Sequence, residues 1–266
     1  MPAYLSMLII VSPANGDRAP EAHAAADAVI TVRDGRLSMP GSIASGWRRI
    51  RVEEDGAGHI IVAFRMRQGS GPVDMRRFLA DLDTAGMTPR TALAIGGPEI
   101  GDTGEVILEL KPGRYVFTCV RSGADGHRHG MNGESRLVTV AGRKNVRAAP
   151  RVGDTVRMAE FAYVAAERWK PGPRVLRVEN IGQQDHQLRI NRLRDGVTTR
   201  EWLAAEKPGA YAKPVVGVAR MGPGAVAYLP VDLSQGDYVI YCLVTDPASK
   251  QTHVMRGMVK PIRVEK

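Results

Sequence analysis

The chain has 266 residues, of which 44% are apolar and 24% charged, with a formal net charge of +9. This length suggests two domains, and the apolar fraction excludes a wholly disordered chain. Two cysteines are too few for a disulfide framework, and no apolar run reaches the roughly 18 residues that a membrane-spanning helix needs. The basic residues are spread as singles and pairs, so nucleic-acid binding is not expected, and a basic surface could equally favour an acidic protein partner.

The first 26 residues are expected to lie outside the folded part of the chain. Residues 5–11 form a short apolar run, and the alanine-rich residues 22–27 resemble an export cleavage site. No basic residue precedes the run, however, and Pro13 and Gly16 interrupt it early. We therefore expect residues 1–26 to be a terminal tail or the remnant of an export segment.

Residues 27–142 have the pattern of a first β domain. Short runs rich in β-branched and aromatic residues alternate with Gly, Pro and Asp clusters, which is typical of a sandwich of about seven or eight strands. The predicted strands are residues 29–32, 50–52, 60–64, 106–110, 115–120 and 137–140. Between them, residues 72–85 have the periodicity of one short helix.

A linker at residues 143–153 is predicted to connect this domain to a second one at residues 154–266. The linker segment has no hydrophobic periodicity. The second domain again combines short β runs, the last at residues 262–264, with one helical segment at residues 199–206. The sequence therefore predicts an all-β chain with a short helical excursion in each domain.

An internal repeat relates the two predicted domains. The segment at residues 110–119, which ends in Cys119, matches residues 233–242, which end in Cys242. Upstream, the segment that leads to His59 matches the one that leads to His186, and downstream Gly130-Met131 matches Gly257-Met258. The offset stays between about 123 and 127 residues, as a tandem duplication requires.

Each copy of the repeat contains the residue types of a copper site. The second copy supplies His186, Cys242, His253 and Met258. The first copy supplies His59, Cys119, His127 or His129, and Met131. Two imidazoles and a thiolate, with a weak thioether on the axis, are the ligands of a blue-copper electron-transfer site.

With these motifs the chain resembles the cupredoxin superfamily of Greek-key β-sandwiches, which includes plastocyanin and azurin. The resemblance depends on residues 180–186, 236–242 and 253–258, and it covers nearly all of both repeats. The His-x4-Met ending also resembles the type 1 copper loop of two-domain nitrite reductases. The resemblance implies two tandem cupredoxin-like domains.

The resemblance also implies ligand roles. In the second domain, His186, Cys242 and His253 would be equatorial copper ligands and Met258 the axial one, with Met255 as a rival. In the first domain, His59, Cys119 and Met131 carry over directly, whereas the second imidazole is His127 or His129. Neither histidine reproduces the spacing of the second copy in that alignment, so the choice between them, and whether copper binds in the first domain, stays open.

The six histidines of the chain are too few for a catalytic copper centre in addition to two such sites, so an enzyme is not expected. The leading hypothesis is a tandem copper-binding protein in electron transfer or copper handling, located by resemblance in the periplasm or secreted. The alternative is a copper-free cupredoxin-like interaction module in which the same residues are core residues or vestigial ligands. The oligomeric state does not follow from the sequence.

Overall fold

The computed structural model describes residues 25–54, 58–85, 87–99, 104–142 and 148–266. Nearly all of the predicted tail (1–26) and residues 143–147 of the predicted linker lie outside the described residues. Among the described residues, no helix is long and apolar enough to cross a membrane.

Strands dominate the N-terminal half, and one α-helix interrupts them as predicted. The helix α1 (Met75–Ala85) begins after Asp74, whose carboxylate accepts a hydrogen bond from the Arg77 N–H at 3.1 Å. The 3-10 helix η2 (His129–Asn132) follows the last central strand. The strands of this half are β1 (Ala28–Arg33), β2 (Arg36–Ser38), β3 (Ser42–Ala44), β4 (Gly46–Glu54), β5 (Ile61–Met66), β6 (Ala92–Ala94), β7 (Pro98–Glu99), β8 (Glu105–Leu110), β9 (Gly113–Cys119) and β10 (Ser135–Ala141).

The C-terminal half repeats this plan. Its α-helix α2 (Thr199–Ala204) lies within the segment predicted to be helical, and two 3-10 helices follow, η3 (Pro208–Ala210) and η4 (His253–Arg256). The strands are β11 (Asp154–Ala159), β12 (Ala162–Val164), β13 (Arg168–Trp169), β14 (Gly172–Asn180), β15 (His186–Leu193), β16 (Ala212–Met221), β17 (Val226–Leu233), β18 (Gly236–Tyr241) and β19 (Val259–Val264).

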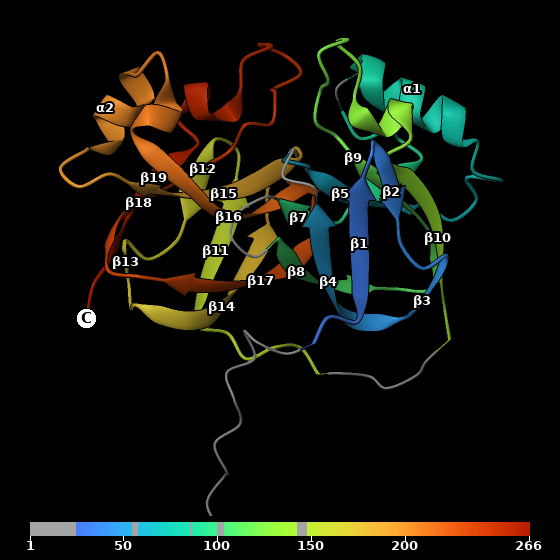
Figure 1. Cartoon of the computed structure of the whole chain (residues 1–266), viewed down its shortest axis with the longest axis horizontal. Coiled ribbons are helices and arrows are strands. Elements are labelled where there is room, and N and C mark those ends of the chain that lie inside the picture. Colours follow the sequence, from blue (N-terminus) through green and yellow to red (C-terminus); the bar gives the residue numbers. More distant parts are fainter. Residues whose placement is uncertain (1–24, 55–57, 86, 100–103, 143–147) are drawn as a thin grey trace, which may run out of the picture.

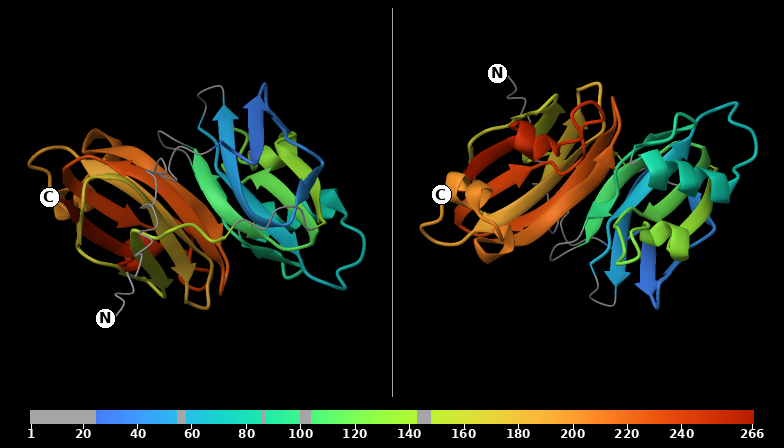
Figure 2. Two further views of the ribbon diagram at one scale, coloured as in Figure 1. Left: turned by 90° about the horizontal axis from the view of Figure 1, so that it is seen from below. Right: turned by 90° about the horizontal axis from the view of Figure 1, so that it is seen from above.

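The halves lie side by side as two sandwiches, with α1 and α2 at the same end of the molecule (Figures 1 and 2). The described strands form three sheets. An eight-stranded sheet with the order β12-β11-β14-β17-β8-β4-β1-β2 runs through both halves. A five-stranded sheet, β3-β10-β9-β5-β6, completes the N-terminal sandwich, and a six-stranded sheet, β13-β19-β18-β15-β16-β7, completes the C-terminal one.

The halves are joined by strand pairing rather than by side-chain contacts alone. In the shared sheet β17 pairs antiparallel with β8, bringing Ala227 opposite Leu108. The short strand β7 leaves the N-terminal half to pair with β16, so that Glu99 lies opposite Gly217. One continuous buried apolar cluster, which contains residues of both halves, fills the space between the sheets. The length and composition were compatible with two cores, whereas the structure merges them.

A buried tyrosine at matching positions shows that the repeat extends to packing details. The Tyr115 hydroxyl donates to the Lys111 carbonyl at 2.8 Å, and the Tyr238 hydroxyl donates to the Ser234 carbonyl at 2.9 Å. Each bond ties a strand to the residue four positions upstream, as in the tyrosine corner of other sandwiches. Such a bond anchors the start of β9 and of β18, the two strands that lead to the cysteines.

Candidate metal centres

The predicted ligands of the C-terminal half lie together and are fully buried. His186 is the first residue of β15, Cys242 follows the end of β18, and His253 begins η4. His186, Cys242, His253 and Met258 are each 0% exposed. We call these four residues site 2. Its ligands come from two neighbouring strands and the loop after them, because β15 pairs with β18.

The donor atoms of site 2 converge. His186 Nδ1 and His253 Nδ1 are 3.0 Å apart, and Cys242 Sγ is 3.5 Å from His253 Nδ1. The backbone N–H of Gln187 donates to Cys242 Sγ at 3.4 Å. All three residues offer a ligand atom within 4.8 Å of the others, so this group could hold a metal ion.

Met258 lies beside two of these ligands. Its N–H donates to the His253 carbonyl at 2.9 Å, and its own carbonyl accepts from the Cys242 N–H at 3.2 Å. Gly257 makes the turn between His253 and Met258 in the left-handed region at φ 98°, where a side chain would be strained. The rival Met255 is 70% exposed, so it lies away from the buried group.

The electrostatics of site 2 suit a metal ion. Desolvation raises the pKa of the Cys242 thiol to about 12 and lowers the pKa of His186. Desolvation, together with the neighbouring His186, lowers the pKa of His253 to about 4. Both imidazoles are therefore neutral at pH 7 and able to coordinate, and a bound cation would supply the charge that stabilises the thiolate. Two neutral imidazoles, a thiolate and a thioether fit copper.

A second group of ligands lies in the N-terminal half, and it contains a residue that the sequence analysis missed. His59, Cys119, His129 and Glu134 could together hold a metal ion. We call these four residues site 1. The carboxylate of Glu134 lies between the two imidazoles, with Oε2 2.7 Å from His59 Nδ1 and Oε1 3.3 Å from His129 Nδ1. Cys119 Sγ is 3.8 Å from His59 Nδ1, and burial raises the pKa of this thiol to about 12.

The loops of the two sites are equivalent when His129 is matched with His253. Each histidine begins a 3-10 helix that ends at a left-handed glycine, Gly133 in the first half and Gly257 in the second. The Glu134 backbone then repeats the bonds of Met258, donating to the His129 carbonyl at 3.3 Å and accepting from the Cys119 N–H at 2.9 Å. Glu134 therefore occupies the place of Met258.

This match corrects the loop alignment made from the sequence. Pairing Gly130-Met131 with Gly257-Met258 displaces the first loop by three residues, because the equivalent glycine is Gly133. The structure places Met131 outside the ligand group and leaves it 39% exposed. His127 is also outside, with an exposed ring whose Nδ1 is 2.9 Å from Asp83 Oδ2. The sequence signal for Glu134 was its spacing of five residues from His129, which equals that of Met258 from His253.

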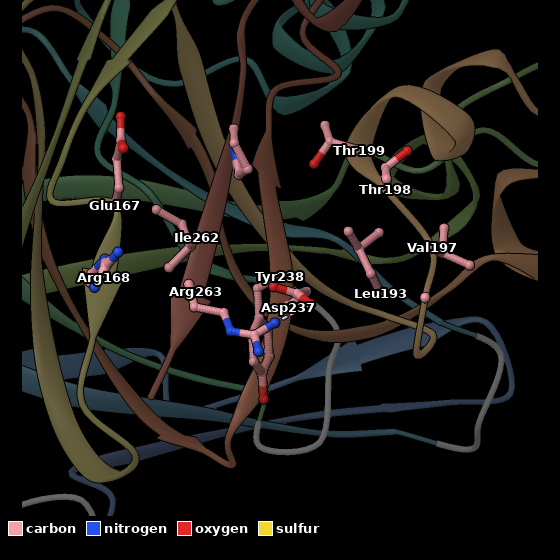
Figure 3. A pocket seen from close by; sticks show the side chains of 12 residues that line it. Glu167, Arg168, Leu193, Val197, Thr198, Thr199, Asp237, Tyr238, Ile262 and Arg263 are labelled. Carbon is pink, nitrogen blue, oxygen red and sulfur yellow. Dashed lines mark hydrogen bonds and ion pairs between the residues drawn. The ribbon is translucent and has the colours of Figure 1, made fainter. Parts of the chain in front are cut away.

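Of two cavities in the described part of the chain, one lies away from the ligand groups and the other borders both of them. One cavity, of about 530 Å³, lies at the ends of β15 and β18 that are opposite to site 2. Figure 3 shows side chains that line it, among them Leu193 and Tyr238. None of the site 1 or site 2 ligands lines it. A cavity of about 440 Å³ lies instead between the halves, and it is bordered by residues that directly follow ligands of both sites, namely Ile60, Val120, Gln187 and Leu243.

Comparisons with known proteins found no matching family model and no matching curated protein. Among solved structures, the chain is similar to a dithionite-reduced auracyanin from Roseiflexus castenholzii, with 20% identity, coverage of 42% of this chain and 95% of that chain, and a TM-score of 0.31. It is also similar to a copper nitrite reductase from Nitrosomonas europaea, with 13% identity, coverage of 90% and 93%, and a TM-score of 0.26. A multicopper oxidase from Campylobacter jejuni gives 12% identity, coverage of 87% and 57%, and a TM-score of 0.28.

Because these identities are at most 20% and the TM-scores at most 0.31, the fold is argued from the chain's own strands and ligand groups. Each half is a β-sandwich with a cysteine at the end of a central strand, one histidine on or beside the neighbouring strand and a second histidine in the following loop. The chain therefore has a cupredoxin-like fold, and the predicted fold class is confirmed.

Proposed function

We propose that this chain is a copper-binding protein that transfers electrons, or handles copper, through site 2. The observation that carries the proposal is the convergence of His186 Nδ1, His253 Nδ1 and Cys242 Sγ in a buried group with Met258 beside it. This donor set accommodates both Cu(I) and Cu(II), so a bound copper ion would supply a one-electron change. The paired strands β15 and β18 hold two of the ligands in place and so limit their rearrangement.

The surroundings of site 2 support the transfer of electrons or copper to a protein partner. Two large apolar side chains close in the chain to the ligands are exposed in this half, namely Leu243 at 38% and Met255 at 70%. Leu243 directly follows Cys242, and Met255 belongs to the same 3-10 helix as His253. A partner that packs on these side chains would come close to the buried ligands without opening the site.

The cavity between the halves supports an acidic partner. Four cationic side chains line it, namely Arg128, Arg189, Arg220 and Lys250, and Asp83 is the one acidic lining residue among those described. Arg189 is paired with Glu99 and Arg220 with Asp185, so carboxylates offset both of these charges. Because this cavity borders residues next to the ligands of both sites, the positive charges of Arg128 and Lys250 favour the approach of an acidic redox protein near the metal centres.

Two further parts of the proposal concern organisation and location. We place the boundaries of the two domains at residues 27–142 and 154–266, since the described strands of the two halves end and begin close to these positions. Resemblance to cupredoxins supports a periplasmic or secreted location.

A copper titration of the reduced, purified protein tests the function. With Cu(II), we expect an intense thiolate-to-copper band in the visible spectrum that is lost in Cys242→Ser and retained in Cys119→Ser. Met255→Leu is a matched control, because this exposed methionine lies on the same loop outside the buried group. Absence of a band at every stoichiometry, with unchanged thermal stability, would contradict the proposal and favour a copper-free interaction module.

A further inference from the structure

The two sites differ in the charge of their donor sets. When its cysteine is ionised, site 2 carries one negative charge, whereas site 1 carries two because of the Glu134 carboxylate. Three of the four residues of site 1 are buried, with His59 3%, Cys119 0% and Glu134 4% exposed, and the His129 side chain is 21% exposed. In such surroundings an uncompensated charge is costly, so the favoured ion is the one whose charge cancels that of its ligands. A divalent ion neutralises site 1, and a monovalent ion neutralises site 2.

The hardness of the fourth donor acts in the same direction. A thioether sulfur such as that of Met258 is a soft donor that favours Cu(I), whereas a carboxylate oxygen favours divalent ions. The position is equivalent in the two halves, because Glu134 and Met258 make the same backbone bonds to the preceding histidine and to the cysteine. The exchange of one residue type therefore changes the chemistry of the site while the backbone around it stays the same.

The Glu134 carboxylate also points at the two imidazoles of site 1 rather than at solvent. Its two oxygens contact the Nδ1 atoms of both imidazoles, at 2.7 Å for His59 and 3.3 Å for His129. The His59 backbone is held in addition by its N–H, which donates to Glu54 Oε2 at 2.8 Å. Four side chains thus supply the four donors of a closed site, as in structural sites for Zn(II).

We propose that site 1 binds a divalent ion of the zinc type through His59, Cys119, His129 and Glu134, and that Glu134 makes it discriminate against Cu(I). Site 2, with Met258 in the equivalent place, accepts Cu(I). The two halves of the duplicated chain therefore differ in metal selectivity. Divalent binding at site 1 is independent of the function proposed for site 2, whereas the difference in selectivity between the halves rests on it.

The experiment uses the full chain with Cys242→Ser, which leaves site 1 as the one complete ligand set among the described residues. Co(II) is titrated as a spectroscopic probe, then competed with Zn(II), and Cu(I) affinity is measured separately with a chelator. We expect a thiolate-to-Co(II) charge-transfer band that Zn(II) abolishes. Adding Glu134→Met is expected to weaken Co(II) and Zn(II) binding by at least roughly tenfold and to shift selectivity toward Cu(I), since even residues behind the ligands change metal affinity 10–100-fold.

Three further variants separate ligation from folding. Glu134→Gln keeps the shape of the side chain and removes its charge, so it is expected to weaken Co(II) binding without loss of the circular dichroism spectrum. His127→Ala and Met131→Leu alter the same loop outside the ligand group, and both are expected to bind Co(II) like the parent. The proposal is overturned if the Cys242→Ser protein binds no divalent ion, or if both Glu134 variants keep the parent's Co(II) affinity and metal selectivity. Copper at site 2 is measured independently in Cys119→Ser protein, so its failure is distinguishable.

Discussion

Glu99 is a residue of the N-terminal half that is built into the sheet of the C-terminal half. On β7, it lies opposite Gly217 and is 2% exposed. Its carboxylate forms an ion pair with Arg189 and accepts hydrogen bonds from Gln187 Nε2 at 3.2 and 3.4 Å. The same Gln187 donates its backbone N–H to Cys242 Sγ, so the interface between the halves is one residue away from site 2.

The Glu99→Ala variant is expected to lose about 3 kcal/mol of unfolding free energy. Removing one partner of a buried ion pair costs about 3–5 kcal/mol, because the other charge is left buried without compensation. The Arg189 side chain is 26% exposed and can be partly hydrated, so the lower end of that range applies. For a chain of this size, about 3 kcal/mol corresponds to a fall in Tm of roughly 6–12 °C.

A double-mutant cycle with Arg189→Met, followed by urea denaturation, isolates the pair from the loss of packing. Because Arg189→Met removes the buried charge, the double variant is expected to be more stable than the sum of the two single losses by more than about 1 kcal/mol. Glu99→Gln, which keeps the acceptor for Gln187 but not the charge, is expected to lie between Glu99→Ala and the parent. Losses that add within about 0.5 kcal/mol would show that the pair is not coupled and would refute the reasoning.

Further predictions concern local features. Thr198 caps α2 through a reciprocal capping box with Glu201, so Thr198→Ala is expected to lower the unfolding free energy by about 1 kcal/mol in urea titrations; an unchanged midpoint would contradict this. Hydrogen bonds from Thr198 hold the pKa of Glu201 below its ordinary value of 4.5, so the stability from this carboxylate is complete above pH 4.5 and is lost as the pH falls through the lower folded-state pKa. Unfolding midpoints measured between pH 5 and 3 are accordingly expected to fall less steeply in Glu201→Gln than in the parent. Gly130→Ala would place Cβ 2.1 Å from Thr118 Oγ1 and is expected to cost about 1–3 kcal/mol, whereas Gly209→Ala meets open space; equal melting curves would exclude the clash.

Much of the strand framework could be predicted because burial in a sandwich imposes a pattern on the sequence. In β1, Ala28, Ile30 and Val32 face the core, and the alternation is visible in the residues themselves. A register slip of one residue would turn these side chains to solvent. Burial therefore fixes the alternating pattern within a strand, and the two copies of the repeat can be aligned there. Both helices were predicted within a few residues, since their apolar spacing differs from that of the strands around them.

The sequence by itself determined that the chain is duplicated and that Cys119 and Cys242 hold equivalent places, because the segments that end in them align without a gap and share Leu, Gly, Tyr, Val and Cys at the same positions. Only the tertiary structure decided that Glu134 takes the place of Met258. Loops carry no such register, so the position of that glutamate depends on where the 3-10 helix ends and Gly133 turns the backbone. The insertion of Glu99 into the opposite half was likewise decided in three dimensions, since a strand of two residues has too little pattern to predict its partner.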